Sequence, residues 1–206
     1  MAVTFDLSAT TNSIGSLTVH LQDGAGAAAA IQFEILLGSA THANNLTGNE
    51  ADNLIVGGIS GDQLTGGGGS DILVGGWSGD TLWGDSGTDV AGRDLLFGGP
   101  GGDTLHGGDE DDLLASGGFD YTSPLDRTAL EAIRLAWRSQ TPYADLVATL
   151  TAGVGPANQY QLNASTYQAD ANVDTLFGEL ESDGFLVDDP AEVSDVAVGE
   201  TVTDLG

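Results

Sequence analysis

The sequence has no cysteine and no lysine, and four arginines are its only strongly basic side chains. Without cysteine there can be no disulfide, thiolate zinc site, iron–sulfur cluster or cysteine nucleophile. Without lysine there is neither a phosphate-loop lysine nor a Schiff-base lysine. No apolar run approaches the roughly 18 residues of a membrane-spanning helix, so we expect no membrane insertion. Residues 1–15 lack the basic start and the apolar core of a secretory signal peptide.

Carboxylates dominate the charge, because 31 Asp and Glu stand against four Arg and give the 206-residue chain a formal charge of −27. Such a charge, with no basic patch, argues against binding to nucleic acid or to anionic lipid surfaces. Acidity of this kind is typical of disordered chains, but a hydrophobic content of 40% with regularly repeated aliphatic residues favours a folded one. The acidity therefore calls for a compensating cation.

A nine-residue pattern, Gly-Gly-x-Gly-x-Asp-x-Leu-x, begins at Gly57. It covers 57–65, 66–74, 75–83, 98–106 and 107–115, with a lengthened copy at 84–97, a degenerate first copy at 47–55 and a fragment at 116–120. Position six is Asp52, Asp62, Asp71, Asp80, Asp103 and Asp112, with Asp89 or Asp94 in the lengthened copy. Position eight is always leucine: Leu54, Leu64, Leu73, Leu82, Leu96, Leu105 and Leu114.

In each copy, six glycine-rich residues favour a turn and the three residues around leucine favour a short strand. Two copies, one for each of two facing sheets, then complete one coil of a roll. Each strand then lies about 4.8 Å from the strand two copies later, with its leucine pointing inward. Stacked turns would bring together Asp52 and Asp71, Asp62 and Asp80, Asp71 and Asp89 or Asp94, Asp80 and Asp103, and Asp94 and Asp112. These carboxylates would repel unless a cation lay between them, and Ca²⁺ prefers such oxygen ligands, which suggests on the order of five ions.

These motifs resemble the RTX nonapeptide family of secreted calcium-binding proteins. The resemblance implies a mainly β fold, a right-handed parallel β-roll, with Ca²⁺ ligands from the Asp of position six and carbonyls near positions two and four. The implied ligands are Gly58, Ser60 and Asp62; Gly67, Gly69 and Asp71; Gly76, Ser78 and Asp80; Gly99, Gly101 and Asp103; and Gly108, Glu110 and Asp112. A single Asp also caps a turn without metal, but the repeated array favours the ion.

Two copies depart from the pattern. In 84–97, Asp85, Gly87 and Asp89 match the turn while Asp94 sets the phase of the strand, so that site is expected to be distorted or absent. Glu110 stands where the pattern has glycine, which puts the backbone of the last turn in question. The nine-residue phase resumes at Asp174 and Asp183, which we include as metal ligands.

The outward residues of alternate strands differ between the two expected sheets. One set is mostly apolar and should be covered by the N-terminal segment, by downstream helices or by another chain: Asn53, Ile55, Ile72, Val74, Leu95, Phe97, Leu113 and Ala115. The other should face solvent: Gln63, Thr65, Thr81, Trp83, Thr104 and His106.

The flanking segments give four expected parts. Residues 1–46 form an N-terminal β segment with strands near 3–7, 16–21 and 31–37, and residues 47–120 form the roll. Residues 121–155 form a two-helix insertion, because Leu130, Ile133 and Trp137 have helical spacing, Thr141-Pro142 starts a second helix and Gly153 ends it. Residues 156–206 extend or cap the roll, and this order of elements resembles the C-terminal region of many large RTX proteins.

No catalytic motif is visible, neither H-E-x-x-H nor G-x-S-x-G, so we do not expect an enzyme. The first hypothesis is a secreted protein that binds several Ca²⁺ and folds on binding them outside the cell; the resemblance implies export by type I secretion machinery. The alternative is an extracellular structural subunit, of a filament, surface layer or adhesin, that self-assembles through the roll. An accessory piece of a hydrolase ranks last.

Overall fold

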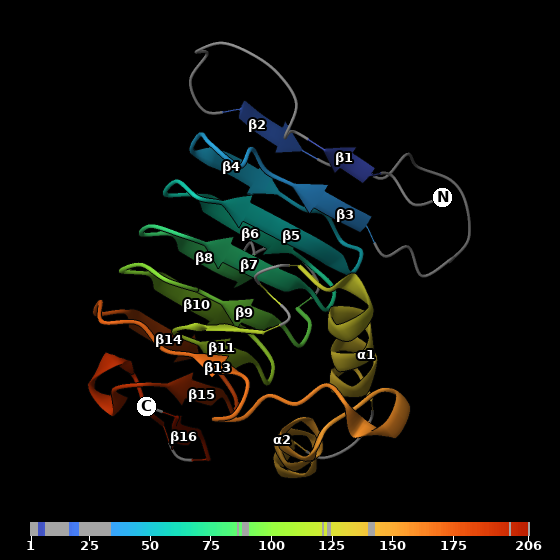
Figure 1. Cartoon of the computed structure of the whole chain (residues 1–206), viewed down its shortest axis with the longest axis vertical. Helices are drawn as coiled ribbons and strands as arrows, with labels where there is room; N and C mark the ends of the chain where they lie inside the picture. The colour runs from blue at the N-terminus through green and yellow to red at the C-terminus, as the bar shows by residue number, and fades with distance from the viewer. Residues whose placement is uncertain are drawn as a thin grey trace.

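Two parallel sheets face each other in the computed structural model of the chain (Figure 1). It describes residues 4–6, 17–20, 34–85, 87, 91–120, 122, 125–139, 143–197 and 199–205. Sheet A contains, in spatial order, β1 (Thr4–Asp6), β3 (Glu34–Leu37), β5 (Asn53–Gly58), β7 (Ile72–Gly76), β9 (Leu95–Phe97), β11 (Leu113–Ala115), β15 (Gly184–Val187) and β16 (Thr201–Asp204). Sheet B contains β2 (Leu17–His20), β4 (Asn44–Thr47), β6 (Gln63–Gly67), β8 (Thr81–Asp85), β10 (Thr104–Gly108) and β14 (Thr175–Glu179).

From β1 to β11 the chain alternates between the two sheets, so each strand pairs in parallel with the strand two steps along the sequence. Beyond the helices, β14 pairs with β10 and β15 with β11, also in parallel. This is the predicted parallel β-roll. The inner faces meet in one apolar layer, which contains the predicted Leu64, Leu73, Leu82, Leu96, Leu105 and Leu114. Phe185 and Leu176 continue this layer into the C-terminal extension, as the resumed nine-residue phase predicted.

The first copy of the repeat was placed one residue too early. Ile55, not Leu54, pairs with Leu73 and lies in the inner layer. Leu54 points outward instead, so the prediction that Ile55 and Asn53 lie on the outer face is wrong. The physical reason is that nine residues counted back from Gly57 begin at Gly48, which puts Asn53 at position six and Ile55 at position eight.

The roll also begins earlier than its glycine-rich copies. β1, β2 and β3 match the strands expected near 3–7, 16–21 and 31–37, and they pair with the roll as further coils. β4 was not predicted as a strand, although Asn44 and Leu46 keep the nine-residue spacing to Asn53 and Ile55. Leu46 pairs with Leu64 in the inner layer.

The helical insertion covers the outer face of sheet A. α1 (Arg127–Trp137) begins after Asp126, whose side chain accepts hydrogen bonds from Thr128 N and Ala129 N, and α2 (Tyr143–Ala152) ends before Gly153 at φ +110°. Among the described residues, the downstream helices cover this face, which is one of the three covers considered (Figure 1). Leu54, Ile72, Val74, Leu95, Phe97, Leu113 and Ala115 pack in one cluster with Leu130, Ile133 and Trp137 of α1 and Leu146 and Leu150 of α2. The predicted cap Thr141-Pro142 lies outside the described residues.

Short elements complete the insertion and the extension. β12 (Gly118–Phe119) and β13 (Tyr167–Gln168) pair antiparallel, and the 3-10 turns η1 (Pro156–Asn158) and η2 (Pro190–Glu192) lie further along the chain. Among the described residues, no helix is both long and apolar enough to cross a membrane.

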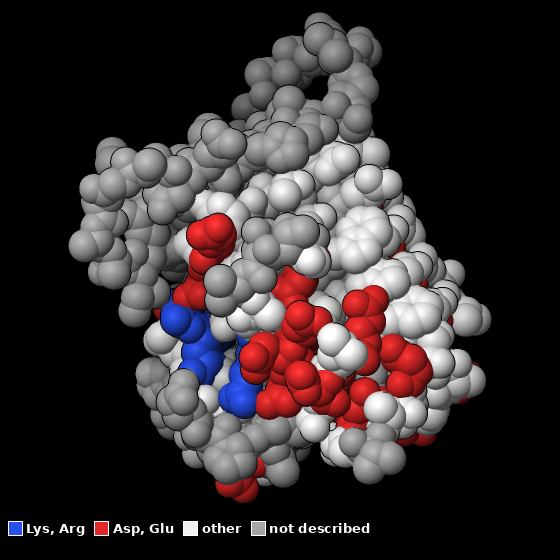
Figure 2. Space-filling model, turned by 180° about the vertical axis from the view of Figure 1, so that it is seen from behind, with Lys and Arg blue, Asp and Glu red and all other residues white. Residues whose placement is uncertain are grey.

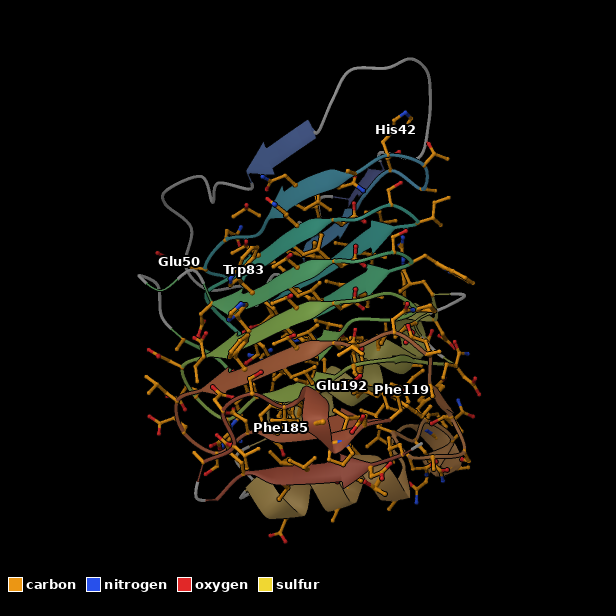
Figure 3. The ribbon with its side chains drawn as sticks, turned by 90° about the vertical axis from the view of Figure 1, so that its left-hand side faces the viewer. His42, Glu50, Trp83, Phe119, Phe185 and Glu192 are labelled. Atoms are coloured by element: carbon orange, nitrogen blue, oxygen red, sulfur yellow. The ribbon has the colours of Figure 1, made fainter. Side chains whose placement is uncertain are left out.

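The outer face of sheet B carries a row of stacked rings. Trp83 and His106 lie parallel with centroids 5.9 Å apart, and His106 and Phe177 lie parallel at 4.8 Å. The predicted outward residues of this sheet are half-buried or exposed, in contrast to those of sheet A. Figure 3 looks onto the roll from the side of sheet B and labels Trp83, the central residue of β8.

Candidate metal centre

Two ladders of acidic side chains run along the roll, one at the start of the strands of each sheet. In each step, the backbone N–H of position six donates to the side-chain carboxylate of position six in the next coil of the same sheet. Ladder B links Asn44, Asp62, Asp80, Asp103, Asp174 and Glu192 at N···O distances of 2.6, 2.7, 2.8, 2.6 and 3.3 Å. Among the described side chains, ladder A links Asn53, Asp71, Asp94, Asp112 and Asp183 at 2.7, 2.7, 2.8 and 2.8 Å.

The ladders contain four of the predicted carboxylate pairs: Asp62 with Asp80, Asp71 with Asp94, Asp80 with Asp103 and Asp94 with Asp112. Of the two candidates in the lengthened copy, Asp94 takes the ladder position, and Asp89 lies outside the described residues. The expected pair of Asp52 with Asp71 is wrong in register, because Asn53 occupies that position. Asp52 instead forms ion pairs with Arg134 and Arg138.

Eight of the nine ladder carboxylates, all except Asp174, have one buried oxygen without a hydrogen-bond partner in the described structure. Oδ1 accepts the amide, but Oδ2 is buried without a partner in Asp62, Asp71, Asp80, Asp94, Asp103, Asp112 and Asp183, as is Oε2 of Glu192. These side chains are at most 3% exposed. Buried polar atoms nearly always have a partner. This repeated row of buried carboxylate oxygens without partners therefore fits a bound cation, because carboxylate oxygens are ligands that Ca²⁺ prefers.

Burial also changes the titration of the ladders. In the absence of a metal ion, burial raises the pKa of Asp80 and Asp174 to about 8 and that of Asp103 and Asp183 to about 7. Burial likewise raises the pKa of Asp71, Asp94 and Asp112 well above 3.8, with neighbouring carboxylates adding to the effect. The ladders therefore need either protons or metal ions at neutral pH.

Backbone carbonyls line the same turns. The carbonyls of Gly58 and Gly108, at position two, accept from Trp77 N and Leu180 N of the following coils. At position four, the carbonyl oxygen of Ser78 lies so close to Gly101 that a Cβ on Gly101 would overlap this oxygen. No three Asp, Glu or His side chains of the described residues converge on one point, so an ion would take part of its ligands from these carbonyls.

The backbone at position four is left-handed in four of the turns, whether the residue is glycine or not. Ser78 and Glu110 have φ of 75° and 74°, close to the 89° of Gly69 and the 77° of Gly87. Although Glu110 replaces a glycine, the backbone of the last turn of the main block therefore keeps the left-handed conformation seen at Gly69 and Gly87. In the lengthened copy, Asp85 ends β8, and its Oδ2 accepts a hydrogen bond from Asp109 N in the next coil.

The C-terminal extension supplies ladder positions that lie far away in sequence. Asp174 and Asp183, predicted from the resumed phase, continue ladders B and A across the helical insertion. Glu192, on η2, was missed because it lies in no recognisable copy, although it is 18 residues after Asp174, the spacing of one full coil. Its position in the lower part of the roll is seen in Figure 3.

Comparison with known proteins bears on the repeat alone. The family model described as the RTX calcium-binding nonapeptide repeat (4 copies) matches residues 41–73, 56–91 and 90–122. Neither a curated protein nor a solved structure matches the chain. The matched region ends before the helical insertion, so the continuation of both ladders into residues 174–192 comes from the structure.

Proposed function

Because this chain carries RTX calcium-binding nonapeptide repeats over residues 41–122, we propose that it is a secreted β-roll that completes its folding when it binds Ca²⁺ outside the cell. The observation that carries the proposal is the row of buried carboxylate oxygens without partners in both ladders. A fold that buries so many acidic groups is costly unless cations compensate them. Binding and folding would then be one coupled process.

The residues that would hold the ions are the ladder carboxylates together with carbonyls of positions two and four. The open Oδ2 of a ladder Asp supplies a charged ligand, and the Gly58 or Ser78 carbonyl supplies a neutral one. A bound Ca²⁺ would supply positive charge that keeps the buried carboxylates ionised. Mg²⁺ fits less well, because it demands octahedral geometry and releases its water reluctantly.

Calcium concentration connects this chemistry to location. Extracellular calcium modules bind in the range of about 10⁻⁴–10⁻³ M, and we place this roll in that class. With such affinity the ladder carboxylates would stay without Ca²⁺ inside a cell and would bind it outside, where the ions compensate their negative charge. Export in an unfolded state through type I secretion machinery is consistent with that order of events.

The test is far-UV circular dichroism and calcium titration of the whole chain. At pH 8 we expect the β signal to increase with Ca²⁺ and to decrease on adding EDTA, with Mg²⁺ at the same concentration giving a smaller change. Equal β content with Ca²⁺ and with EDTA would contradict the proposal. Equilibrium dialysis on the same sample counts the ions.

The alternative is a self-assembling structural subunit. An apolar outer face covered by another chain would favour it, but α1 and α2 cover that face within the chain. Its remaining support is the edge of sheet A at β16, which pairs only with β15 among the described strands. Light scattering that increases with Ca²⁺ would favour this alternative.

A further inference from the structure

Asp52 stands apart from the ladders that it adjoins. It is 8% exposed, and its Oδ1 accepts from Ser70 N of the next coil at 2.9 Å, much as a ladder carboxylate accepts an amide. Position six of its own coil is Asn53, which carries no charge. The first described turn of ladder A therefore has a buried carboxylate, but one residue out of phase.

Oδ2 of Asp52 has partners, whereas Oδ2 of ladder residues such as Asp71 and Asp94 has none in the described structure. It lies 3.0 Å from Arg134 Nη1 and forms a second ion pair with Arg138 Nη1. Arg134 is 2% exposed and also pairs with Glu131 at 2.7 Å, so its guanidinium is fixed between two carboxylates. Arginine stays charged at all physiological pH and donates in a planar fork that suits a carboxylate.

These two arginines come from a part of the chain that does not belong to the repeat. Arg134 lies on α1 and Arg138 is its C-cap residue, 82 or more residues after Asp52. Figure 2 shows arginines at the margin of a face on which Asp and Glu gather. α1 thus brings positive charge to the first turn of the described part of ladder A, besides covering the apolar face of sheet A.

We infer that Arg134 and Arg138 act as the built-in cation of this first turn, so that Asp52 is not a calcium ligand and the helical insertion closes the end of ladder A. The inference rests on the proposed function, because it takes Ca²⁺ as the cation of the other turns. It replaces the expectation that Asp52 and Asp71 share a cation. The remaining ladder positions, from Asp71 onward, keep their predicted role.

The first experiment counts calcium ions per chain by equilibrium dialysis at saturating Ca²⁺. We expect Asp52→Asn to bind the same number of ions as the wild type, whereas the matched Asp71→Asn change loses at least one. Loss of an ion in Asp52→Asn would overturn the inference. A wild type that binds no calcium would instead overturn the proposed function, so the two failures are distinguishable.

The second experiment removes the arginines. We expect Arg134→Gln/Arg138→Gln to bind one more ion than the wild type, because the freed Asp52 becomes available to calcium. Adding Asp52→Asn to that pair should return the count to the wild-type number, because it removes the unpaired charge of Asp52. Arg127→Gln, an exposed position on the same helix, is the control and should change nothing. An unchanged count in the arginine double variant contradicts the inference.

Discussion

The amide of Asp103 donates to Oδ1 of Asp174 at 2.6 Å, although 71 residues separate them in the sequence. Two helices and a short antiparallel pair lie between these positions, yet the hydrogen bond is the same as that between Asp80 and Asp103 in the main block. Every ladder bond runs from an earlier amide to a later carboxylate. The main block therefore depends on the extension to satisfy its last amides.

Asp174 should consequently matter as much as any ladder residue inside the matched repeats. We expect Asp174→Asn to raise the calcium concentration at the folding midpoint by about tenfold, because it removes a charged ligand from the row. Asp145→Asn, an exposed change on α2, is the matched control and should leave the midpoint unchanged. Calcium titration followed by circular dichroism measures both, and equal midpoints would show that the extension binds no ion.

The calcium-free protein should lose stability as pH rises. The pKa values of Asp80 and Asp174 in the fold are about 8, against 3.8 when unburied, so the folded state holds protons that the unfolded chain has released. This contribution is fully present below about pH 4 and is lost as pH rises through about 8. We expect Tm in EDTA to fall between about pH 5 and pH 8.

Saturating calcium should reverse that dependence. Ions hold the ladder carboxylates ionised, so acid must compete with calcium, and Tm should then fall as pH decreases. Thermal denaturation at matched pH values with Ca²⁺ or EDTA gives both curves. Parallel curves would argue that the ladders do not carry the ions.

The first glycine of each copy should tolerate no side chain. A Cβ on Gly66 would overlap Asp71 Oδ2 and the Gly84 carbonyl, so we expect Gly66→Ala to destabilise the roll by about 1–3 kcal/mol or more. Gly102 is the control, because a Cβ there would first meet Val173 O at 3.4 Å, and Gly102→Ala should cost less than about 0.5 kcal/mol. Chemical denaturation in Ca²⁺ measures the difference.

The cover over sheet A can be tested with two positions on one helix. Trp137 is fully buried against the sheet, so Trp137→Ala should cost about 3–5 kcal/mol. Leu135 is 57% exposed, and Leu135→Ala should change stability by less than about 0.5 kcal/mol. If both variants are equally stable, α1 does not hold the sheet as the structure has it.

Much of this fold could be predicted from periodicity. The nine-residue phase identified the inner leucines and the neighbouring carboxylates. It could do so because glycine-rich turns and short strands let successive coils stack in one register, with equivalent positions side by side. Helical spacing identified Leu130, Ile133 and Trp137 as one buried face, and the structure places that face on sheet A.

Prediction failed where the glycines thin out. At 47–55 a Leu at the wrong phase looked like position eight, and only counting back from Gly57 gives Ile55. Asn44 was missed because it replaces the aspartate that marked the other copies. The pairing of Asp52 with Arg134 could not have been predicted, since it depends on how a helix docks 82 residues later.

The three tryptophans are distributed so that each reports on a different part of the molecule. Trp77 is 55% exposed on a turn, Trp83 stacks on the outer face of sheet B, and Trp137, the last residue of α1, is buried in the cluster between α1 and sheet A. Single-tryptophan variants would therefore distinguish, by fluorescence, whether the turns, the sheet or the helical cover forms first as calcium is added. The protein contains its own optical probes for the order of its assembly.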